Sequence, residues 1–504
     1  MKFKLIKFTI KGVPSNYIIL HPSTAENQDL DPGSLLVTED NTIGFRLITS
    51  ASVDQGFAGL PPDRFNGESL IEGQDITLIS AGVESLTKII RRKMDKKTLS
   101  DREIDDFMSA IAHGLVTKSH MTAFGTAVEI NGMHGDEITS VAQSIIKNSR
   151  KFSHSGKKVV DKHSIGGIAG NRITPLMIPI ISACGLVIPK ISTRAITSPA
   201  GTVDALETVM PVDLTFEEAS EVLDKTNACM VNGATVELGS VADKFLEAVS
   251  PLKIDPKEMM IASILAKKKA AGSDFVLIDL PTGKGSKLAS REDARSLAYD
   301  FSRIGNSLGQ HIEAVISPGD KPVGSMIGPS LEMKEVMTIL ECSGGALSLK
   351  RKATSLAGLI LEGVQQANRG EGQQMATEII DSGKALSKFR EIVAAQGGDA
   401  SVTSNSIPHA PYSHVIEAEK SDIVYALDSY SIGVMARAAG APHDSHAGVI
   451  IHVDRGDNLK PGDPIIEIRS HSEGKLSEAI EMMRTAPPII LEQSVLEHIT
   501  GISN

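Results

Sequence analysis

The sequence predicts a multidomain α/β + α protein, because three kinds of local pattern follow one another along its 504 residues. Residues 1–82 alternate polar and apolar side chains between Gly, Pro and Asp turns, as half-buried strands do. From Glu84 the apolar residues recur with the period of a helix, and beyond residue 156 strand-like and helical segments are mixed. A chain of this length exceeds one ordinary hydrophobic core, so several domains are expected.

We expect four domains. A small N-terminal β domain occupies residues 1–82, and a helical domain occupies residues 83–155 together with part of 209–232. The helical domain is expected beside a mixed-sheet α/β domain at residues 156–400, which carries the loops described below. An α+β C-terminal domain, with short strands and turns, occupies residues 401–504.

Local signals place several elements within these domains. Ser100 followed by Glu103 forms the capping box that starts a helix. Residues 173–191 are mostly apolar, and the break at Gly185 predicts a buried helix followed by a short strand. Residues 275–280 predict a buried strand, because they are almost continuously apolar.

Composition limits the class of partner. The formal net charge of −11 disfavours binding to nucleic acid or to an anionic membrane surface. The cysteines, Cys184, Cys229 and Cys342, lie far apart and form no C-x-x-C pair, as in reduced intracellular proteins. No apolar stretch reaches the length of a membrane span, and the N-terminus lacks the apolar core of a signal peptide. We therefore expect a cytoplasmic protein that contacts neither membrane nor nucleic acid.

Two loops rich in small residues, 161–172 and 192–204, bracket the apolar run. Each loop mixes hydroxyl groups with a cation. Glycines let backbone N–H groups approach phosphate oxygens, hydroxyls add donors, and Lys or Arg supplies charge. Neither loop has the Walker pattern or a G-x-G-x-x-G pattern. The second loop and a third basic loop, 281–287, each follow a predicted strand, which is where open α/β sheets bind ligands. These patterns indicate an anion site that is not a P-loop.

The two loops resemble those of the thymidine and pyrimidine-nucleoside phosphorylase family. The family's K-H-S-x-G-G motif is matched by Lys162, His163, Ser164, Gly166 and Gly167. Its signature S-x-R-[GA]-[LI]-x(3)-[GA]-G-T-x-D-x-[LI]-E is matched by Ser192, Arg194, Ala195, Ile196, Ala200, Gly201, Thr202, Asp204, Leu206 and Glu207. The extra N-terminal domain and the form of residues 194–198 are most similar to the long (type 2) branch, which holds the AMP phosphorylases and relatives called thymidine phosphorylases. The resemblance implies a cleft between the helical and α/β parts.

The resemblance implies a set of anion and substrate contacts. Phosphate would be bound by Lys162, Ser164, Ser192, Thr202 and the backbone of Gly166 and Gly167. Nucleotide contacts would come from Gly167, Thr193, Arg194, Ala195, Ile196, Thr197, Ser198 and Thr202. Thr202 also suits the N-cap of a helix that begins at Val203. His163 suits a structural hydrogen-bonding role within its loop.

The resemblance also implies a base-binding side. Asp255 with Pro256 and Glu258 has the pattern of a helix start, with Asp255 as N-cap and Pro256 as the first helical residue. In the long branch the matching Asp is the catalytic residue that donates a proton to the leaving base. That role needs a carboxyl whose pKa is raised by burial or by a nearby anion such as phosphate.

Three further residues are candidates on this side. Ser263 and Lys267 lie four residues apart, hence on one helix face, and in the family they face the base and the glycosyl group. Lys267 equally suits a solvated position in the run of lysines at 267–269. Lys287 matches a further nucleotide contact and could reach a 5′-phosphate.

The leading functional hypothesis is a phosphorylase that acts on an AMP-like nucleoside 5′-monophosphate and releases free base and ribose 1,5-bisphosphate. The alternative is a thymidine or pyrimidine-nucleoside phosphorylase that releases a pentose 1-phosphate. Short-form thymidine phosphorylases carry an Arg upstream of the Ser-Ile-Leu-x-Lys helix, which residues 244–249 lack, and His-Thr where this chain has Ser198-Pro199. The chemistry needs no metal or redox cofactor, with inorganic phosphate as co-substrate.

Two other classes are less well supported. A phosphoribosyltransferase related to the anthranilate enzyme would need acidic residues that hold magnesium, and no Asp pair stands near these loops in the sequence. A nucleotide-sensing or assembly protein would bind without turnover, which the intact loops disfavour. The family implies at least a homodimer.

Overall fold

The computed structural model describes residues 1–10, 13, 16–28, 30–39, 43–65, 70–80, 83–154, 156–195 and 198–492. The chain divides into two compact units. The first contains Met1–Arg150 and Gly239–Lys267, and the second contains Lys151–Leu238 and Lys268–Asn504. Among the described residues, no helix combines the length and apolar character needed to cross a membrane.

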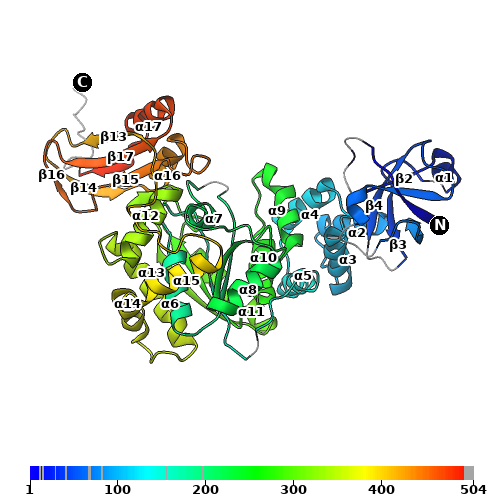
Figure 1. The fold of residues 1–504 in the computed structure, drawn as a ribbon, viewed down its shortest axis with the longest axis horizontal. Coiled ribbons are helices and arrows are strands. Elements are labelled where there is room, and N and C mark those ends of the chain that lie inside the picture. The colour runs from blue at the N-terminus through cyan, green and yellow to red at the C-terminus, as the bar shows by residue number, and fades with distance from the viewer. Residues whose placement is uncertain are drawn as a thin grey trace, which may run out of the picture. The chain divides into compact units, whose positions relative to one another are not determined.

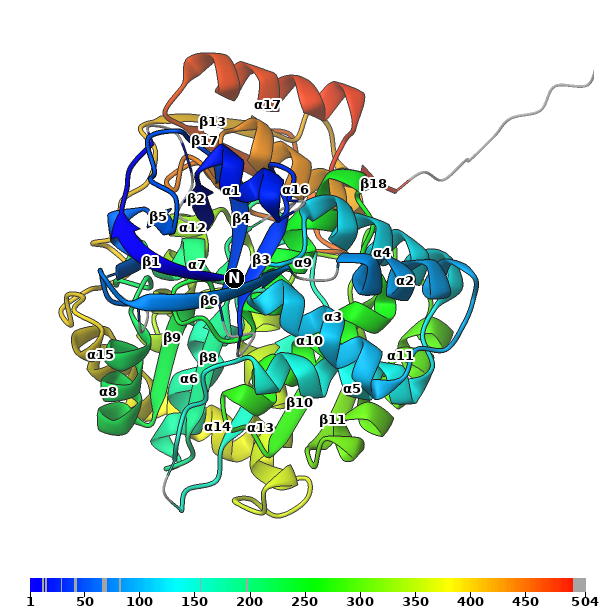
Figure 2. The same cartoon turned by 90° about the vertical axis from the view of Figure 1, so that its right-hand side faces the viewer.

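The expected N-terminal β domain is a closed barrel whose strands follow the order β1-β5-β2-β4-β3-β6 (Figure 2). Closure leaves no strand edge unpaired, and the alternating apolar residues fill the interior. Leu5, Leu47 and Leu78 are fully buried there. The elements are β1 Lys2–Lys7, β2 Tyr17–Leu20, α1 Pro22–Asn27, β3 Leu35–Thr38, β4 Gly44–Thr49, β5 Phe57–Leu60, the 3₁₀ helix Pro62–Phe65 and β6 Asp75–Ser80.

The same unit contains a helical bundle. Its helices are α2 Val83–Met94, α3 Asp101–Ala112, α4 Lys118–Asn131, α5 Gly135–Lys147, α9 Ser240–Val249 and most of α10 Lys257–Ala270, with a 3₁₀ turn at Ser250–Leu252. The predicted capping box is confirmed: the Glu103 backbone N–H donates to Ser100 Oγ, and the Ser100 backbone N–H donates to the Glu103 carboxylate. Helix α10 begins at Lys257, one residue later than expected.

A buried ion pair joins α2 to α5 in this bundle. Lys93 Nζ lies 2.9 Å and 3.1 Å from the two carboxylate oxygens of Glu137, and both side chains are almost fully buried. The Glu137 carboxylate also accepts hydrogen bonds from the backbone N–H groups of Leu99 and His134. These four contacts satisfy the buried charge and fix the two inter-helix connections.

The second unit contains the α/β domain, built around parallel strands. Strands β7 Val160–Ser164, β10 Phe275–Thr282 and β11 His311–Pro318 form a sheet in the order β11-β10-β7, and β8 Ile188–Ser192 pairs with β9 Ala228–Asn232. A parallel bridge between Val159 and Val187 connects the two sets. The helices are α6 Thr174–Ala183, α7 Thr202–Leu206, α8 Phe216–Thr226, α11 Arg291–Ser307, α12 Pro329–Leu340, α13 Leu347–Gly363, α14 Gly372–Asp381 and α15 Lys384–Ala395.

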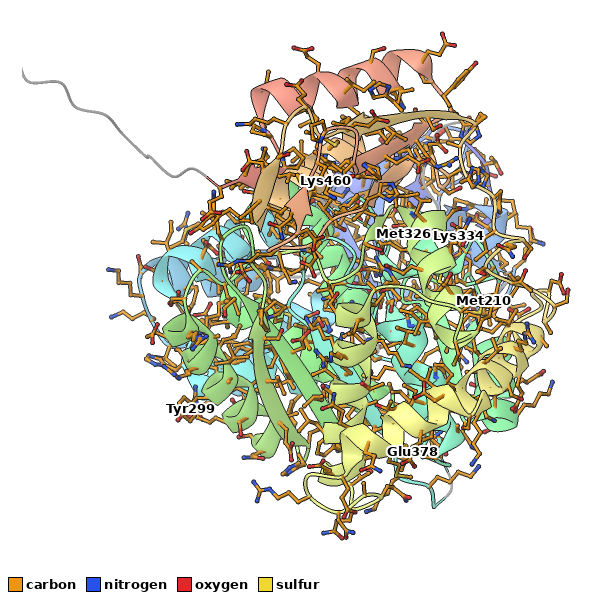
Figure 3. The ribbon with its side chains drawn as sticks, turned by 90° about the vertical axis from the view of Figure 1, so that its left-hand side faces the viewer. Met210, Tyr299, Met326, Lys334, Glu378 and Lys460 are labelled. Atoms are coloured by element: carbon orange, nitrogen blue, oxygen red, sulfur yellow. The ribbon has the colours of Figure 1, made fainter. Side chains whose placement is uncertain are left out.

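Helices cover the strands on both sides, as helical crossovers between parallel strands require (Figures 1 and 3). Helix α11 lies outermost on one side, with Tyr299 directed to solvent (Figure 3). The predicted helix before Gly185, the strand that ends at Ser192 and the buried strand 275–280 are all present as α6, β8 and β10.

Two sequence expectations need correction here. All described pairings among β7–β11 are parallel, so the sheet is not mixed; the antiparallel pairing of this region is made by β12, Met326–Ile327, with the C-terminal β15. Residues 209–232 belong to the α/β unit instead of the helical one, because the apolar face of α8 packs into the core around β9. Residues 239–267 supply the bundle's extra helices.

The C-terminal part of the second unit is α+β, as expected. Its sheets follow the orders β12-β15-β17-β13 and β16-β14-β18, and all of their pairings are antiparallel. Helices α16 and α17 pack on them around a core that includes Ile432, Met435 and Ile466. The elements are β13 Tyr412–Glu417, β14 Asp422–Leu427, α16 Ser429–Ala438, β15 Gly448–Ile451, β16 Asn458–Leu459, β17 Pro464–Ser470, α17 Glu473–Thr485 and β18 Ile489–Leu491.

The buried ion pair gives a stability prediction. Replacing Glu137→Ala leaves the Lys93 ammonium group buried without its counter-charge, so we expect the free energy of unfolding of the first unit to fall by about 3–5 kcal/mol. Urea denaturation measures this change. Glu247→Ala is the matched control, because Glu247 pairs with Lys118 at the surface and its loss should change stability by less than about 1 kcal/mol. Equal effects of the two substitutions would contradict the prediction.

Candidate active site

The three loops rich in small residues all leave the carboxyl ends of parallel strands. The first follows β7, the second follows β8 and the third follows β10. Since β7 pairs with β10 and the Val159–Val187 bridge connects β7 to β8, the three ends lie at one edge of the domain. The sequence predicted this location for the second and third loops, because each follows an apolar run, but not for the first.

The first loop presents an open backbone. Gly166 and Gly167 are exposed, and Gly167 has a φ of +114°, which a residue with a side chain rarely adopts. A Cβ atom at Gly167 would meet no atom within 4 Å, so conformation and not crowding requires glycine here. Space therefore remains beside these main-chain N–H groups for an anion.

Asp279 organises the residues beneath this loop. It is fully buried on β10, directly opposite Ser164 of β7. Its carboxylate accepts hydrogen bonds from the hydroxyls of Ser164 (2.7 Å) and Ser317 (2.6 Å), and Lys352 Nζ lies 3.1 Å away. Burial alone would raise the pKa of Asp279, but Lys352, Lys162 and the two hydroxyls outweigh it and lower the pKa. Asp279 is therefore ionised and holds Ser164 in place.

A second buried carboxylate, Asp161, lies on β7 next to Lys162. Lys268 Nζ is 2.6 Å from one Asp161 oxygen, and Lys190 Nζ is 3.6 Å from the other. Lys190 also donates to the Lys162 main-chain oxygen at 2.8 Å, which ties β8 to β7. The two aspartates thus hold the lysines that surround the start of the first loop.

The lysines outnumber the carboxylates in this buried group. Among the described residues, Lys162, Lys190, Lys268 and Lys352 surround Asp161 and Asp279. Burial, the largest cause, and the neighbouring lysines lower the pKa of Lys162 well below its usual value. The same causes lower the pKa of Lys190 to about 7. Because a nearby anion would favour the charged form of these lysines, the group is suited to an anion site.

The second loop is fixed by Asp204, which lies on α7. The Asp204 carboxylate accepts hydrogen bonds from the backbone N–H groups of Ala195 and Gly201, each at 2.8 Å. A Cβ atom at Gly201 would lie 2.4 Å from the Ala195 nitrogen, so only glycine fits this position. Thr202 is the first residue of α7 and Gly201 precedes it as N-cap, so the expectation that Thr202 caps the helix is wrong.

Arg172 connects the first and second loops, a role that the sequence analysis did not assign. It is buried at the end of the first loop, and its guanidinium donates to the Thr202 hydroxyl (2.7 Å) and the Ala200 carbonyl (2.9 Å). Its Nε donates to Glu332 on α12 at 2.7 Å. Arg172 therefore fixes the position of Thr202 relative to the glycines of the first loop.

The other predicted residues of the second loop differ in their surroundings. The Arg194 guanidinium is paired with Glu207 (2.5 and 2.8 Å) and Asp213 (2.9 Å), which raise its pKa. Ser192 is half-buried at the end of β8, and Thr193 is exposed. Ser198 donates to the Ala200 carbonyl at 3.0 Å. Two predicted contacts, Ile196 and Thr197, lie outside the described residues.

Helix α16, in the C-terminal domain, contacts all three loops, a contact that the sequence did not predict. Ser429 Oγ accepts a hydrogen bond from the Ala169 backbone N–H of the first loop. A Cβ atom at Gly433 would lie 3.6 Å from Pro199 of the second loop, and one at Gly285 of the third loop would lie 3.2 Å from Tyr430. Lys284 of the third loop pairs with Asp428, the N-cap of α16, at 3.5 Å. The C-terminal domain therefore contacts each of the three loops and helps to hold it in place.

In the third loop, Lys287 is exposed, and the loop is closed by Ser286, whose hydroxyl lies within hydrogen-bond distance of the Gly283 and Leu288 carbonyls.

The remaining predicted residues belong to the first compact unit. Asp255 is exposed in the segment before α10. Ser263 and Lys267 are half-buried on α10, and the Lys267 ammonium is ion-paired with Asp243 of α9. The alternative expectation, a solvated position for Lys267 within the run of lysines at 267–269, is therefore wrong.

The sequence does contain signals for the residues that were missed. Asp279 is the charged residue within the otherwise apolar stretch 275–280, and Lys190 follows a comparable apolar stretch. A charge in a buried strand requires a partner, so each could have been flagged as part of a network. Their partners could not be named, because Lys352, which pairs with Asp279, and Asp161, which pairs with Lys190, come from distant parts of the chain.

Comparison with known proteins adds three family descriptions. Residues 87–149 match the helical bundle domain of a glycosyl transferase family, and residues 156–386 match its a/b domain. Residues 423–489 match the pyrimidine nucleoside phosphorylase C-terminal domain. Together these descriptions cover the helical, α/β and C-terminal parts of the chain.

Similar proteins of full length are also known. The chain is 38% identical to an AMP phosphorylase of Pyrococcus furiosus over 96% of this chain and 97% of the relative. It is 39% identical to one of Thermococcus sibiricus over 95% of both, and 35% identical to one of Methanosarcina barkeri over 99% of both. Among solved structures, anthranilate phosphoribosyltransferase from Thermus thermophilus matches 61% of this chain and 99% of its own, with a TM-score of 0.52 and 16% identity, a likeness of fold.

The geometry around Arg172 yields a prediction for anion binding. In Arg172→Lys a single ammonium group replaces the fork that reaches Thr202, Ala200 and Glu332, so the second loop should lose its fixed position. We expect the affinity for inorganic phosphate, measured by isothermal titration calorimetry, to fall by about 10-fold, equivalent to about 1.4 kcal/mol. Arg303→Lys, at a surface pair with Asp300, is the control and should leave the affinity unchanged. An unchanged affinity in Arg172→Lys would contradict the role assigned to Arg172.

Proposed function

The chain belongs to the AMP phosphorylase family, and we propose that it cleaves the N-glycosidic bond of a nucleoside 5′-monophosphate with inorganic phosphate. The products are the free base and ribose 1,5-bisphosphate. The protein is thus a pentosyltransferase. The observation that carries the proposal is the open glycine loop at the end of β7 above a buried group with more lysines than aspartates, because such a site favours a small anion.

Inorganic phosphate is proposed to bind at the first and second loops. The backbone N–H groups of Gly166 and Gly167 and the hydroxyls of Ser164, Ser192 and Thr202 supply donors. Lys162 supplies charge: a bound anion raises the pKa that burial has lowered, so the ammonium form becomes favoured when phosphate is present. Donors that are already fixed position the nucleophile without reorganisation at the moment of reaction.

The leaving base needs a proton, and Asp255 is the proposed donor. Asp255 is exposed in this structure. Ser263 and Lys267 on α10 are proposed to face the base and the glycosyl group, with Lys267 oriented by Asp243. General acid catalysis by a positioned carboxyl contributes typically about 10²–10⁴-fold to the rate.

The nucleotide is proposed to contact the second and third loops. Gly167, Thr202 and residues 193–198 contact the nucleotide; because the Arg194 side chain is paired with carboxylates, Arg194 contributes through its backbone. Lys287, exposed on the third loop, contacts the 5′-phosphate. This contact separates a nucleotide substrate from a nucleoside.

A second candidate function is a pyrimidine-nucleoside phosphorylase, including thymidine phosphorylase, and the match of residues 423–489 to the C-terminal domain of that family supports it. It uses the same phosphate loops and leaves Lys287 without a substrate contact. The proposed reaction requires no metal or redox cofactor, with phosphate as co-substrate. We further propose a cytoplasmic homodimer or larger homo-oligomer that binds neither nucleic acid nor membrane.

Base release distinguishes the two candidates. Free base is measured from AMP, CMP, UMP, thymidine and uridine, with and without inorganic phosphate. We expect phosphate-dependent turnover of the monophosphates and little from the nucleosides, and Asp255→Asn should lower the rate by about 10²-fold or more. Turnover of thymidine or uridine alone would overturn the nucleotide proposal.

The third loop offers a matched pair of variants for the same assay. Lys287→Met should raise the KM for the monophosphate by roughly 10-fold, because a charge-assisted contact with the 5′-phosphate is lost. Lys284→Met removes a neighbouring exposed lysine that contacts Asp428 and only supports the loop, so it should raise the KM less than Lys287→Met does. Equal KM values in the two variants would show that Lys287 does not contact the 5′-phosphate.

A further inference from the structure

Three side chains of the C-terminal domain meet at one point away from the three loops. Asp444 and His446 lie in the segment between α16 and β15, and His471 directly follows β17. One ligand atom from each residue lies within 4.8 Å of the others. Two imidazoles and one carboxylate form a donor set that proteins use for divalent transition metals.

The contacts within this group show how closely its members approach. His471 Nδ1 lies 3.0 Å and 2.9 Å from the two carboxylate oxygens of Asp444. The Asp444 carboxylate also accepts from the backbone N–H groups of His446 (3.1 Å) and His471 (3.3 Å). The His446 and His471 rings lie side by side, with centroids 5.4 Å apart.

The backbone that carries these side chains is fixed by the rest of the domain. The Ser445 carbonyl accepts from the Ser330 N–H at the start of α12 (2.9 Å), and the His446 carbonyl accepts from the Ala410 N–H (3.1 Å). On the other side, the buried Ser470 hydroxyl donates to the Ala439 carbonyl at 2.7 Å. The three side chains therefore come from segments that are already held in register, as a metal site requires.

An ion pair between Asp444 and His471 accounts for only two of the three residues. Among the described residues, the His446 imidazole makes no hydrogen bond, although it lies beside the pair and is half-buried. The position of the His446 imidazole is explained if it is the third ligand of a metal ion shared with Asp444 and His471. Magnesium and calcium prefer oxygen ligands, so two imidazoles favour zinc or a similar metal.

We propose that Asp444, His446 and His471 bind a divalent transition metal, with zinc as the best fit. Zinc bonds to imidazole nitrogen and carboxylate oxygen are about 2.0–2.2 Å long. Small side-chain rotations bring the three ligand atoms to this distance, and the metal then takes the place of the hydrogen bond between His471 Nδ1 and Asp444. Three protein ligands leave a fourth position for water. The metal would join the segment before β15 to the end of β17.

The test uses the full chain without a histidine tag, stripped of metal with a chelator. Zinc is titrated calorimetrically, and we expect one saturable site per chain. His446→Ala and His471→Ala should each weaken zinc binding by at least about 10-fold. His414→Ala, an exposed histidine on β13 of the same domain, is the matched control and should leave the affinity unchanged.

A second readout guards against variants that fail to fold. Zinc should raise the midpoint of thermal unfolding of the unaltered chain and of His414→Ala, because a ligand that binds only the folded state stabilises it. It should not raise the midpoint of His446→Gln, which keeps a polar side chain at that position. Absence of a saturable site, or equal zinc affinity in the unaltered chain and in the His446 and His471 variants, would overturn the proposal.

Discussion

The anion site depends on the charge of Asp279. This carboxylate is fully buried on β10, and its contacts with Ser164, Ser317 and Lys352 join three elements that are distant in sequence. A buried charge is tolerated only when it is paired and hydrogen-bonded, so these elements must come together for the domain to fold. The hydrogen bond to Asp279 that holds Ser164 beneath the glycine loop is therefore also needed for folding.

The same principle explains why the proposed site would favour an anion. Asp161 and Asp279 do not balance the lysines around them, and burial lowers the pKa of Lys162 and Lys190. Without a bound anion, burial favours the uncharged form of Lys162 and Lys190, and a bound anion would favour their charged form. In an acidic protein with a net charge of −11, this local excess of lysines would let the proposed site attract phosphate although the protein as a whole is negatively charged.

Much of the fold and part of the site could be predicted from sequence. The alternation in residues 1–82, the capping box at Ser100 and the apolar strand that contains Asp279 are local signals, and the structure contains the corresponding elements. The positions of the second and third loops at strand ends followed from the same patterns. Local signals could not show that 209–232 pack with the α/β unit, because long-range packing decides between two compatible cores. They also could not show that α16 supports all three loops, since Ser429 and Tyr430 are ordinary polar residues in the sequence.

The most direct test of this account is the number of protons exchanged when phosphate binds. Isothermal titration calorimetry in two buffers of different ionisation enthalpy gives this number, at a pH where free phosphate is already a dianion. The account predicts net proton uptake, because the bound anion raises the pKa of Lys162 and Lys190, which burial holds low in the free protein. Phosphate binding with no proton uptake, or with proton release, would contradict it.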